Sequence, residues 1–525
     1  MSTLNDSLRF VSNLFLDKGL TKKAYLNALT VVLDYAATLL VGFILTPLMV
    51  AGLGDYFYGL WQILNRLIGY ITPASGRPGY ALKWTLANHQ ASTDYAQKRR
   101  YVGSTLIIWL LFLPFLIVLG GMISWFVPDW VHASAESVWI TRLVAALLVT
   151  NIVVDTLSSV PQVTLQGENL GYKRMGMSVV LIFVGGGFTW LALYFGTGIV
   201  GVAASVVIAT IVTGLFYLWV VRSYTPWFGV SRPGRAETYQ MLGLSWWFLA
   251  WNFVTSLILA SDVVVLGLLN SVESVTNYSL TKYVPETMIG AIVIVIFGIT
   301  PGLGSIIGTG DYKRASRLRG EIMALIWLVV TALGTNILLW NKTFLGLWVG
   351  ADRYSGSIPN LLIVVAAMQL AYIRSDGNII DLTLRLKSKV LLGFLSVTIS
   401  ISIAAVAVGY FKLGIVGLCL GIIAGRLIMS LGYPALIGRY LDISLSSQLI
   451  STIRPAIIMV LLFAAAALLD SYLPMLAPTG LIGWAAFIAL AGITGILVLL
   501  ISFYSGLTSG QRNHILRRIR AAIAA

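Results

Sequence analysis

The feature that most constrains this chain is a succession of long apolar stretches. A helix that crosses a bilayer needs about 20 mostly apolar residues, and the 525-residue sequence contains fourteen windows of that kind. Hydrophobic residues make up 58 % of the chain and charged residues only 10 %, whereas soluble domains carry about 25 % charged residues. The sequence therefore predicts an all-α polytopic membrane protein. The fourteen expected spans lie near 27–51, 58–75, 102–127, 138–160, 175–195, 198–221, 243–269, 277–302, 321–340, 358–381, 390–409, 413–432, 454–470 and 482–504.

The basic residues indicate how these spans are oriented. Cytoplasmic loops of membrane proteins carry an excess of Lys and Arg. If the N-terminus is inside, the inner segments and the two termini hold 27 of the 35 basic residues, and the outer loops hold three. A miscount by one span would destroy this asymmetry, so fourteen spans with both termini cytoplasmic are expected. The same rule and anionic lipid account for the net charge of +15, and no nucleic-acid partner is expected.

A short phrase occurs twice in the chain. Residues 194–201 read YFGTGIVG and residues 410–417 read YFKLGIVG. The first copy joins the fifth and sixth expected spans, and the second joins the eleventh and twelfth. Copies that are an even number of spans apart have the same orientation, which indicates a parallel duplication. A weaker similarity supports the duplication: Arg66 follows Tyr58 by eight residues, and Glu286 follows Tyr278 by the same spacing.

The repeat and the loops suggest a domain organisation. We expect two parallel-repeat six-helix bundles followed by two C-terminal helices, with both chain ends basic. The expected segments are an N-terminal interfacial segment 1–26, a first lobe 27–222, a cytoplasmic linker 223–242, a second lobe 243–432, a cytoplasmic loop 433–453, helices thirteen and fourteen over 454–505, and a basic amphipathic tail 506–525. The tail is suited to anionic inner-leaflet lipid, and docking to a partner protein is the alternative.

The sequence lacks the usual signs of an enzyme. It contains no GxxxxGK[ST] phosphate loop, and the longest stretch outside the spans, 76–101, has about 26 residues, which is too short for a soluble catalytic domain. The three histidines, His89, His132 and His514, are scattered and the chain has a single cysteine. We therefore expect no metal, no cofactor and no enzymatic activity. Two six-helix lobes without a nucleotide-hydrolysing domain are typical of a secondary transporter.

Several stretches resemble a known family. LTPLMVAGLGDYFYGLWQILNRLIGYI (45–71) resembles the first hairpin of polysaccharide flippases, the Wzx-type branch of the multidrug/oligosaccharidyl-lipid/polysaccharide (MOP) exporter superfamily. VPQVTLQGENLGYKRMGMSVV (160–180) is similar to the inner loop between helices four and five of that family, and SDVVVLGLLNSVESVTNYSL (261–280) is similar to the corresponding hairpin of the second lobe. The resemblance covers essentially the whole chain, and its motifs are mostly structural.

The resemblance implies a function. It implies a MATE-like fold with a central cavity that opens alternately to each side, and a polyprenyl-diphosphate-linked oligosaccharide as cargo. The expected role is that of a flippase in the bacterial inner membrane for O-antigen, capsule or exopolysaccharide biosynthesis, with a polysaccharide polymerase or chain-length protein as a conceivable partner. A cation-coupled multidrug antiporter of the same fold is the first alternative. A membrane glycosyltransferase or polymerase is the second, although no outer loop carries candidate catalytic residues.

Charges within the expected spans are the candidate site. A charge at the bilayer centre costs at least about 2.5–3.5 kcal/mol, so it should face a cavity or a partner. The cations are proposed to line a cavity that binds the diphosphate, and the acids to carry a coupling proton or cation or to pair with the cations. The candidate cations are Arg66, Arg142, Lys282, Arg374 and Arg426, and the candidate acids are Asp34, Asp155, Asp262, Glu286 and Asp381.

Each of these residues also has a structural interpretation. Arg66 could instead form a salt bridge with Asp34. Lys282 and Glu286, which are i and i+4 on one helix, could pair within that helix. Arg142 and Arg426 lie near span ends, where a long side chain can reach the interface.

Overall fold

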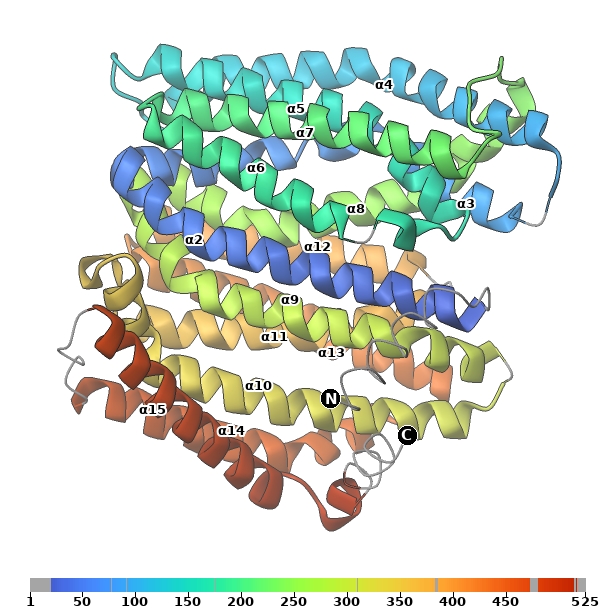
Figure 1. Ribbon diagram of the computed structural model, residues 1–525. Coiled ribbons are helices and arrows are strands. Elements are labelled where there is room, and N and C mark those ends of the chain that lie inside the picture. The colour runs from blue at the N-terminus through green and yellow to red at the C-terminus, as the bar shows by residue number, and fades with distance from the viewer. Residues whose placement is uncertain are drawn as a thin grey trace, which may run out of the picture. The chain divides into compact units, whose positions relative to one another are not determined.

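The computed structural model describes residues 20–76, 78–90, 92–174, 176–308, 310–382, 386–472, 480–513 and 516. Over these residues the chain is built from α-helices with short 3₁₀ and π turns, which confirms the expected all-α class (Figure 1). The helices are α2 (Leu20–Gly69), α3 (Pro78–Asn88), α4 (Tyr95–Trp130), α5 (Val138–Gly167), α6 (Met177–Tyr194), α7 (Gly198–Tyr224), α8 (Arg235–Leu269), α9 (Val272–Gly308), α10 (Tyr312–Trp348), α11 (Ser357–Leu382), α12 (Leu386–Ala405), α13 (Gly414–Leu441), α14 (Leu445–Tyr472) and α15 (Gly480–Ile501).

Twelve helices among the described residues are long and apolar enough to cross a membrane, so the chain is a multi-pass membrane protein. The expected number was fourteen. One of the twelve, Leu29–Gly69, contains two expected spans, because only Gly54 interrupts the helical backbone of α2 between them. The expected span near 277–302 falls within α9, which is not among the twelve. Each of the other expected spans corresponds to one of the twelve.

The chain forms two compact units. Unit 1 comprises Met1–Gly54 and Leu67–Asn252, and unit 2 comprises Asp55–Arg66 and Phe253–Ala525. The second arm of α2 therefore belongs with the later part of the chain, and the boundary at Asn252 lies inside α8. The lobes expected over 27–222 and 243–432 stay a prediction. Most of the expected segment 1–26 and of the tail 506–525 lies outside the described residues.

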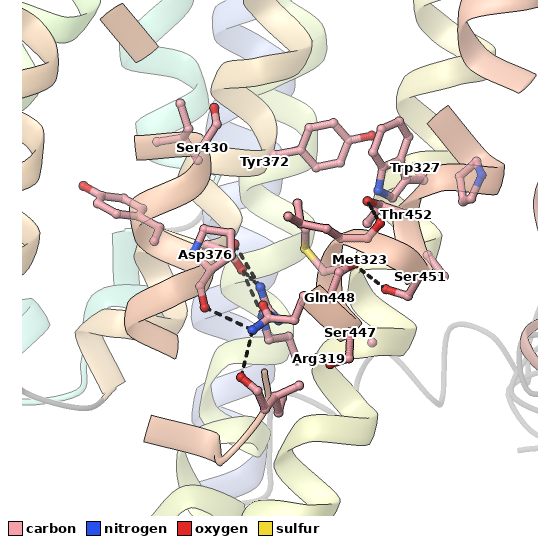
Figure 2. Close-up of a pocket in the computed structure, with 18 of the residues that line it drawn as sticks. Arg319, Met323, Trp327, Tyr372, Asp376, Ser430, Ser447, Gln448, Ser451 and Thr452 are labelled. Carbon is pink, nitrogen blue, oxygen red and sulfur yellow. Dashed lines mark hydrogen bonds and ion pairs between the residues drawn. The ribbon is translucent and has the colours of Figure 1, made fainter. Parts of the chain in front are cut away.

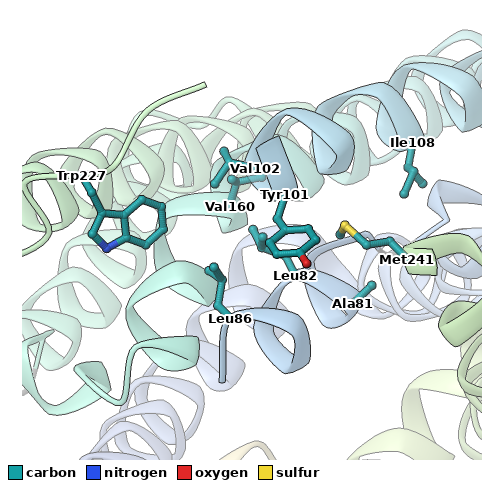
Figure 3. Close-up of a cluster of buried hydrophobic side chains, with 9 residues drawn as sticks. All are labelled: Ala81, Leu82, Leu86, Tyr101, Val102, Ile108, Val160, Trp227 and Met241. Atoms are coloured by element: carbon teal, nitrogen blue, oxygen red, sulfur yellow. The ribbon is translucent and has the colours of Figure 1, made fainter. Parts of the chain in front are cut away.

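Unit 1 is organised around α5, which packs against α3, α4 and α7, while α6 packs on α7. One end of this bundle holds an apolar core to which α3, α4, α5, α8 and the segment before α8 all contribute (Figure 3). Tyr101 of α4 is buried at its centre, and Asp94 caps α4 by accepting a hydrogen bond from the Gln97 amide at 2.9 Å. The cap satisfies a free amide at the helix start and fixes where α4 begins. The core residues are Ala81, Leu82, Leu86, Tyr101, Val102, Ile108, Val160, Trp227 and Met241.

In unit 2, α11 packs against α9, α10 and α13, and α12 lies along α13. The last two helices, α14 and α15, both pack on α10. Polar side chains join α15 to α10, since Asn336 donates to the Ala491 carbonyl at 3.1 Å and the Trp340 indole donates to Thr494 at 2.9 Å. Hydrogen bonds of this kind hold helices together in lipid, where apolar contact alone provides little preference.

The two copies of the repeated phrase form similar turns. Gly196 and Gly198 have positive φ in the first copy, and Lys412 and Gly414 have positive φ at the matching positions of the second. The copies differ just before the turn, because the helix leading to the second copy ends in a π turn over Val406–Tyr410. The shared left-handed conformation explains why Gly198 recurs as Gly414, since other residues adopt this conformation at a cost.

Candidate functional site

Charged side chains from α2, α8 and α9 meet within unit 2. On α9, Tyr278, Lys282 and Glu286 follow one another at intervals of four residues and so share one face. This face meets Asp262 of α8, whose carboxylate accepts hydrogen bonds from the Tyr278 hydroxyl at 2.8 Å and from the Lys282 ammonium at 2.5 Å. Asp262 is only 4 % exposed. Its charge is thus compensated by a cation and a hydroxyl donor, as a buried carboxylate requires.

The other end of this network is open. Arg66, on the second arm of α2, forms an ion pair with Glu286 at 3.0 Å, and Lys282 lies 3.9 Å from the second oxygen of the same carboxylate. The Arg66 and Glu286 side chains are 30 % and 41 % exposed. A ligand can therefore reach Arg66 and Glu286, whereas Asp262 lies beyond them in the interior.

Arg426 of α13 joins the same region without a carboxylate partner among the described residues. Its guanidinium donates to the backbone carbonyls of Ala366 and Ile258, each at 3.1 Å, and Ile258 lies one turn before Asp262 on α8. Arg66, Lys282 and Arg426 against Asp262 and Glu286 are three cations against two anions, which leaves one net positive charge. A site with this balance favours an anionic ligand.

Contacts at the start of the second α2 arm position Arg66. Asp55 forms an ion pair with Arg353 at 2.8 Å, and its backbone carbonyl accepts a hydrogen bond from the Thr276 hydroxyl at 2.6 Å. One turn later Gly59 approaches α9 so closely that a Cβ atom there would lie 2.2 Å from the Val272 carbonyl oxygen. A larger residue at position 59 would push the arm away from α9, and Arg66 would lose its register with Glu286.

A second group of charges lies at the far end of α11. Lys389 of α12 forms an ion pair with Asp381 at 2.6 Å, and the ammonium side chain is almost fully buried whereas Asp381 is 41 % exposed. Arg374 of α11 is half-buried. Within the described part of the chain, no ion pair or hydrogen bond involves its side chain. One turn on, the side-chain nitrogen of Asn378 is buried without a hydrogen-bond partner among the described residues. Among the described residues, the Arg374 guanidinium and the Asn378 amide nitrogen therefore remain available to an anion.

Two of the candidate acids, Asp34 and Asp155, belong to unit 1. Asp34 accepts a hydrogen bond from Ser178 at 2.5 Å, and the alternative salt bridge between Asp34 and Arg66 stays a prediction. Asp34 and Asp155 line a cavity of about 430 Å³ between α2, α5, α6 and α7, together with several hydroxyl groups. Arg142, which also belongs to unit 1, has its guanidinium 4.0 Å from the centre of the Trp125 ring. Its cation is held by that aromatic face.

Several charged residues that the structure pairs are not evident from the sequence. Arg353, Arg319 and Lys389 lie outside the expected spans, although Arg319 and Lys389 are buried. The helices extend beyond their apolar windows: α10 begins at Tyr312 rather than near 321. Charged residues within two turns of a predicted span were the available signal, because a helix continues past the end of its hydrophobic stretch.

Comparison with known proteins identifies the family. Residues 25–306, which are more than half of the chain, match the model of the family described as polysaccharide biosynthesis protein. The chain belongs to this family. The resemblance expected from its sequence motifs is thereby confirmed. A search of curated proteins finds no match.

Solved structures show which fold this family member shares. An inward-facing multidrug resistance MATE transporter of the MOP superfamily aligns with a TM-score of 0.63 and 15 % identity, over 78 % of this chain and 96 % of the transporter. The lipid II flippase MurJ in an inward closed conformation aligns with a TM-score of 0.62 and 10 % identity, over 91 % of this chain and 98 % of MurJ. A MOP superfamily transporter from Pyrococcus furiosus, for which a reverse polarity of the binding pocket suggests a different function, aligns with a TM-score of 0.55 and 15 % identity, over 81 % and 97 % of the two chains. At these identities the likeness establishes the MOP fold.

Proposed function

We propose that this polysaccharide biosynthesis protein is a flippase that moves a polyprenyl-diphosphate-linked oligosaccharide from the inner to the outer leaflet of the bacterial inner membrane. Family membership supports the biosynthetic role, and the MOP fold supports alternating access of two lobes. In this proposal the chain crosses the membrane fourteen times with both termini in the cytoplasm, which is the arrangement that its basic residues favour. A polysaccharide polymerase would receive the cargo on the outer side.

The observation that carries the proposal is the net positive charge of the Arg66 network. Charges within a membrane are costly, so three cations against two acids in one network call for a further anion. A diphosphate supplies it. The guanidinium of Arg66 suits that ligand because its planar donors bind two phosphate oxygens at once.

The geometry suggests how the cargo is bound and released. Arg66 is the exposed cation of the network, and its carboxylate partner Glu286 is exposed as well. A diphosphate would displace Glu286 from Arg66, and the freed carboxylate would still have Lys282 nearby at 3.9 Å. Return of Glu286 to Arg66 would release the cargo on the other side. Arg374 would add positive charge beyond this network, and the polyprenyl tail would stay in lipid.

Energy coupling is assigned to the acids of unit 1. Asp34 and Asp155 line the same cavity, and no Lys or Arg is among its described lining residues. A carboxylate in such a place is suited to a proton or a monovalent cation. The same cavity favours the second candidate function, which is a cation-coupled multidrug antiporter, because an acid-lined cavity also accepts an organic cation.

The test is reconstitution of the purified full chain in liposomes with a labelled polyprenyl-diphosphate oligosaccharide, with and without a pH gradient. We expect protein-dependent transfer of the label, loss of transfer in Arg66→Ala, and partial retention in Arg66→Lys, which keeps the charge but not the two parallel hydrogen bonds. Arg222→Ala is the matched control, since Arg222 is an exposed cation at the end of α7. Equal transfer by Arg66→Ala and Arg222→Ala, at equal protein levels, would refute the assignment of Arg66.

The antiporter is tested in the same liposomes with a cationic dye. Protein-dependent dye movement that is lost in Asp155→Asn, together with no transfer of the saccharide lipid, would replace the flippase proposal. Saccharide transfer that loses its dependence on the gradient in Asp155→Asn would instead support coupling through unit 1.

A further inference from the structure

A second cavity lies within unit 2, away from the Arg66 network. It has a volume of about 370 Å³ and is enclosed by α10, α11, α13 and the first turns of α14 (Figure 2). Pockets that bind small ligands have volumes of about 300–1,000 Å³. The cavity is therefore large enough for a ligand of the size of a sugar ring.

The charges that line this cavity cancel each other. Arg319 of α10 donates three hydrogen bonds of 2.9–3.1 Å to the carboxylate of Asp376 on α11. Its remaining nitrogen donates to the Gln448 side chain of α14 at 2.7 Å. Both charged groups are almost fully buried and they point at each other in Figure 2. Since the pair is complete, the cavity has no free charge among its described residues with which to select an ion.

Three neutral polar atoms of the lining side chains lack partners. The indole nitrogen of Trp327, the amide oxygen of Gln369 and the hydroxyl of Tyr372 are all buried without a hydrogen bond among the described residues. The described lining of this cavity thus has one unpaired donor, one unpaired acceptor and one group that can be either. Buried polar atoms are normally paired, and each exception calls for an explanation. Their concentration around one cavity points to a ligand that would pair them.

Aromatic and hydroxyl groups complete the cavity wall. The rings of Trp327 and Tyr372 lie 4.6 Å apart between centres, and Figure 2 shows them together at one side of the cavity. On α14, Ser451 and Thr452 donate to backbone carbonyls of their own helix at 2.7 and 2.8 Å, which leaves their oxygens free to accept. Ser451 is exposed, so the cavity opens to the surface beside the start of α14.

We propose that this cavity is a second binding site, which takes a neutral saccharide group. A sugar ring presents an apolar face that packs on an aromatic ring, and its hydroxyls both donate and accept. It would accept from Trp327, donate to Gln369 and the α14 hydroxyls, and pair with Tyr372. An anion would find no unpaired cation here, and a bare hydrocarbon chain would leave the three polar atoms unpaired. The saccharide could be the headgroup of a glycolipid or a free oligosaccharide.

The experiment measures binding to the purified full chain by native mass spectrometry, in a detergent without sugar groups. The probes are monoglucosyl diacylglycerol, the same diacylglycerol without sugar, and free maltotriose. We expect the glucosyl lipid to bind and the sugar-free lipid not to bind. Competition by maltotriose would indicate that free saccharide suffices, and its absence would indicate that the site requires a lipid-borne saccharide.

Variants locate the binding site. Tyr372→Phe removes the hydroxyl and keeps the ring, whereas Trp327→Phe removes the indole nitrogen and leaves a smaller aromatic ring, and each should weaken binding by about three- to tenfold. Trp109→Phe is the matched control, because the Trp109 indole nitrogen is also buried without a partner in the part of the chain that the structure describes, but it belongs to α4 of unit 1. Tyr372→Phe should not lower the melting temperature of the ligand-free protein, since it removes an unpaired buried hydroxyl.

Three results would overturn the proposal. They are equal binding of the glucosyl and sugar-free lipids, unchanged binding in both cavity variants, and no binding of either saccharide probe. The outcome is independent of the flippase proposal, because the readout is the binding of a neutral probe rather than transport of a diphosphate-linked cargo.

Discussion

The approach of α13 to α12 leads to a quantitative prediction for Gly425→Ala. A Cβ atom at Gly425 would lie 2.1 Å from the Ser400 hydroxyl oxygen, and 2.4 and 2.6 Å from the backbone nitrogen and Cα of Ser400. The hydroxyl can rotate away but the backbone of α12 cannot. Because carbon atoms pack at about 3.5–4.0 Å, the two helices must separate locally by about 1 Å.

Two contacts determine how much stability Gly425→Ala should lose. Overpacking of this kind typically costs about 1–3 kcal/mol. The Ser396 hydroxyl also donates to the Gly425 carbonyl at 2.9 Å, and an interhelical hydrogen bond in a membrane contributes about 0.6 kcal/mol on average. We therefore expect Gly425→Ala to destabilise the protein by about 2–3.5 kcal/mol. The neighbouring Arg426 should also shift from the Ala366 and Ile258 carbonyls that it binds.

Thermal unfolding of the purified protein in detergent is the assay, with an expected fall in melting temperature of about 2–3 °C for a chain of this length. Gly492→Ala is the control, because a Cβ atom at that position of α15 has nothing within 4 Å. Both substitutions bring the same gain in helix propensity, so their difference reports the clash. If Gly425→Ala melts at the same temperature as Gly492→Ala, the close packing of α12 on α13 is wrong.

Three further predictions concern the backbone and the charged network. Gly54→Ala should lower the free energy of unfolding by about 1–3 kcal/mol, because Gly54 has φ 75° and ψ 168°. An unchanged melting temperature would contradict this. Glu286→Gln should bind the labelled diphosphate cargo more tightly and turn over more slowly, because Arg66 loses its carboxylate partner; weaker binding in an equilibrium assay would count against the exchange mechanism. Both Gly196 and Lys412 have positive φ, which favours glycine. In a denaturation assay, Gly196→Ala should therefore lower the free energy of unfolding by about 1–2 kcal/mol, whereas Lys412→Gly should not lower it.

Sequence alone predicted the candidate site only in part. It singled out Arg66, Lys282, Asp262 and Glu286 because charges are rare and costly in apolar spans, and the structure brings these four together. It offered a pair of Lys282 and Glu286 within one helix as an alternative, and the structure places these two groups 3.9 Å apart. It did not predict the partners that come from other helices. The partner of Arg66 is Glu286, 220 positions away in the chain, and no periodicity within a helix specifies a contact of that kind.

Other features escaped sequence analysis for the same reason. Arg426 is held by two backbone carbonyls, and every residue carries such an acceptor, so the sequence offers no sign of them. The cavity between α10, α11, α13 and α14 depends on how four helices pack. Trp327 and Tyr372 look like ordinary aromatic residues of membrane helices until their rings are found side by side.

The sequence by itself determined the membrane class, the helical architecture and the family, because hydropathy and motifs are local properties of the chain. Lipid leaves a spanning segment almost no alternative to a helix, since every backbone polar group must be paired within it. Only the tertiary structure decided which buried charge meets which partner, that residues 55–66 join unit 2, and where cavities remain. These depend on contacts between residues far apart in the chain, and such contacts form only when specific helix surfaces come together.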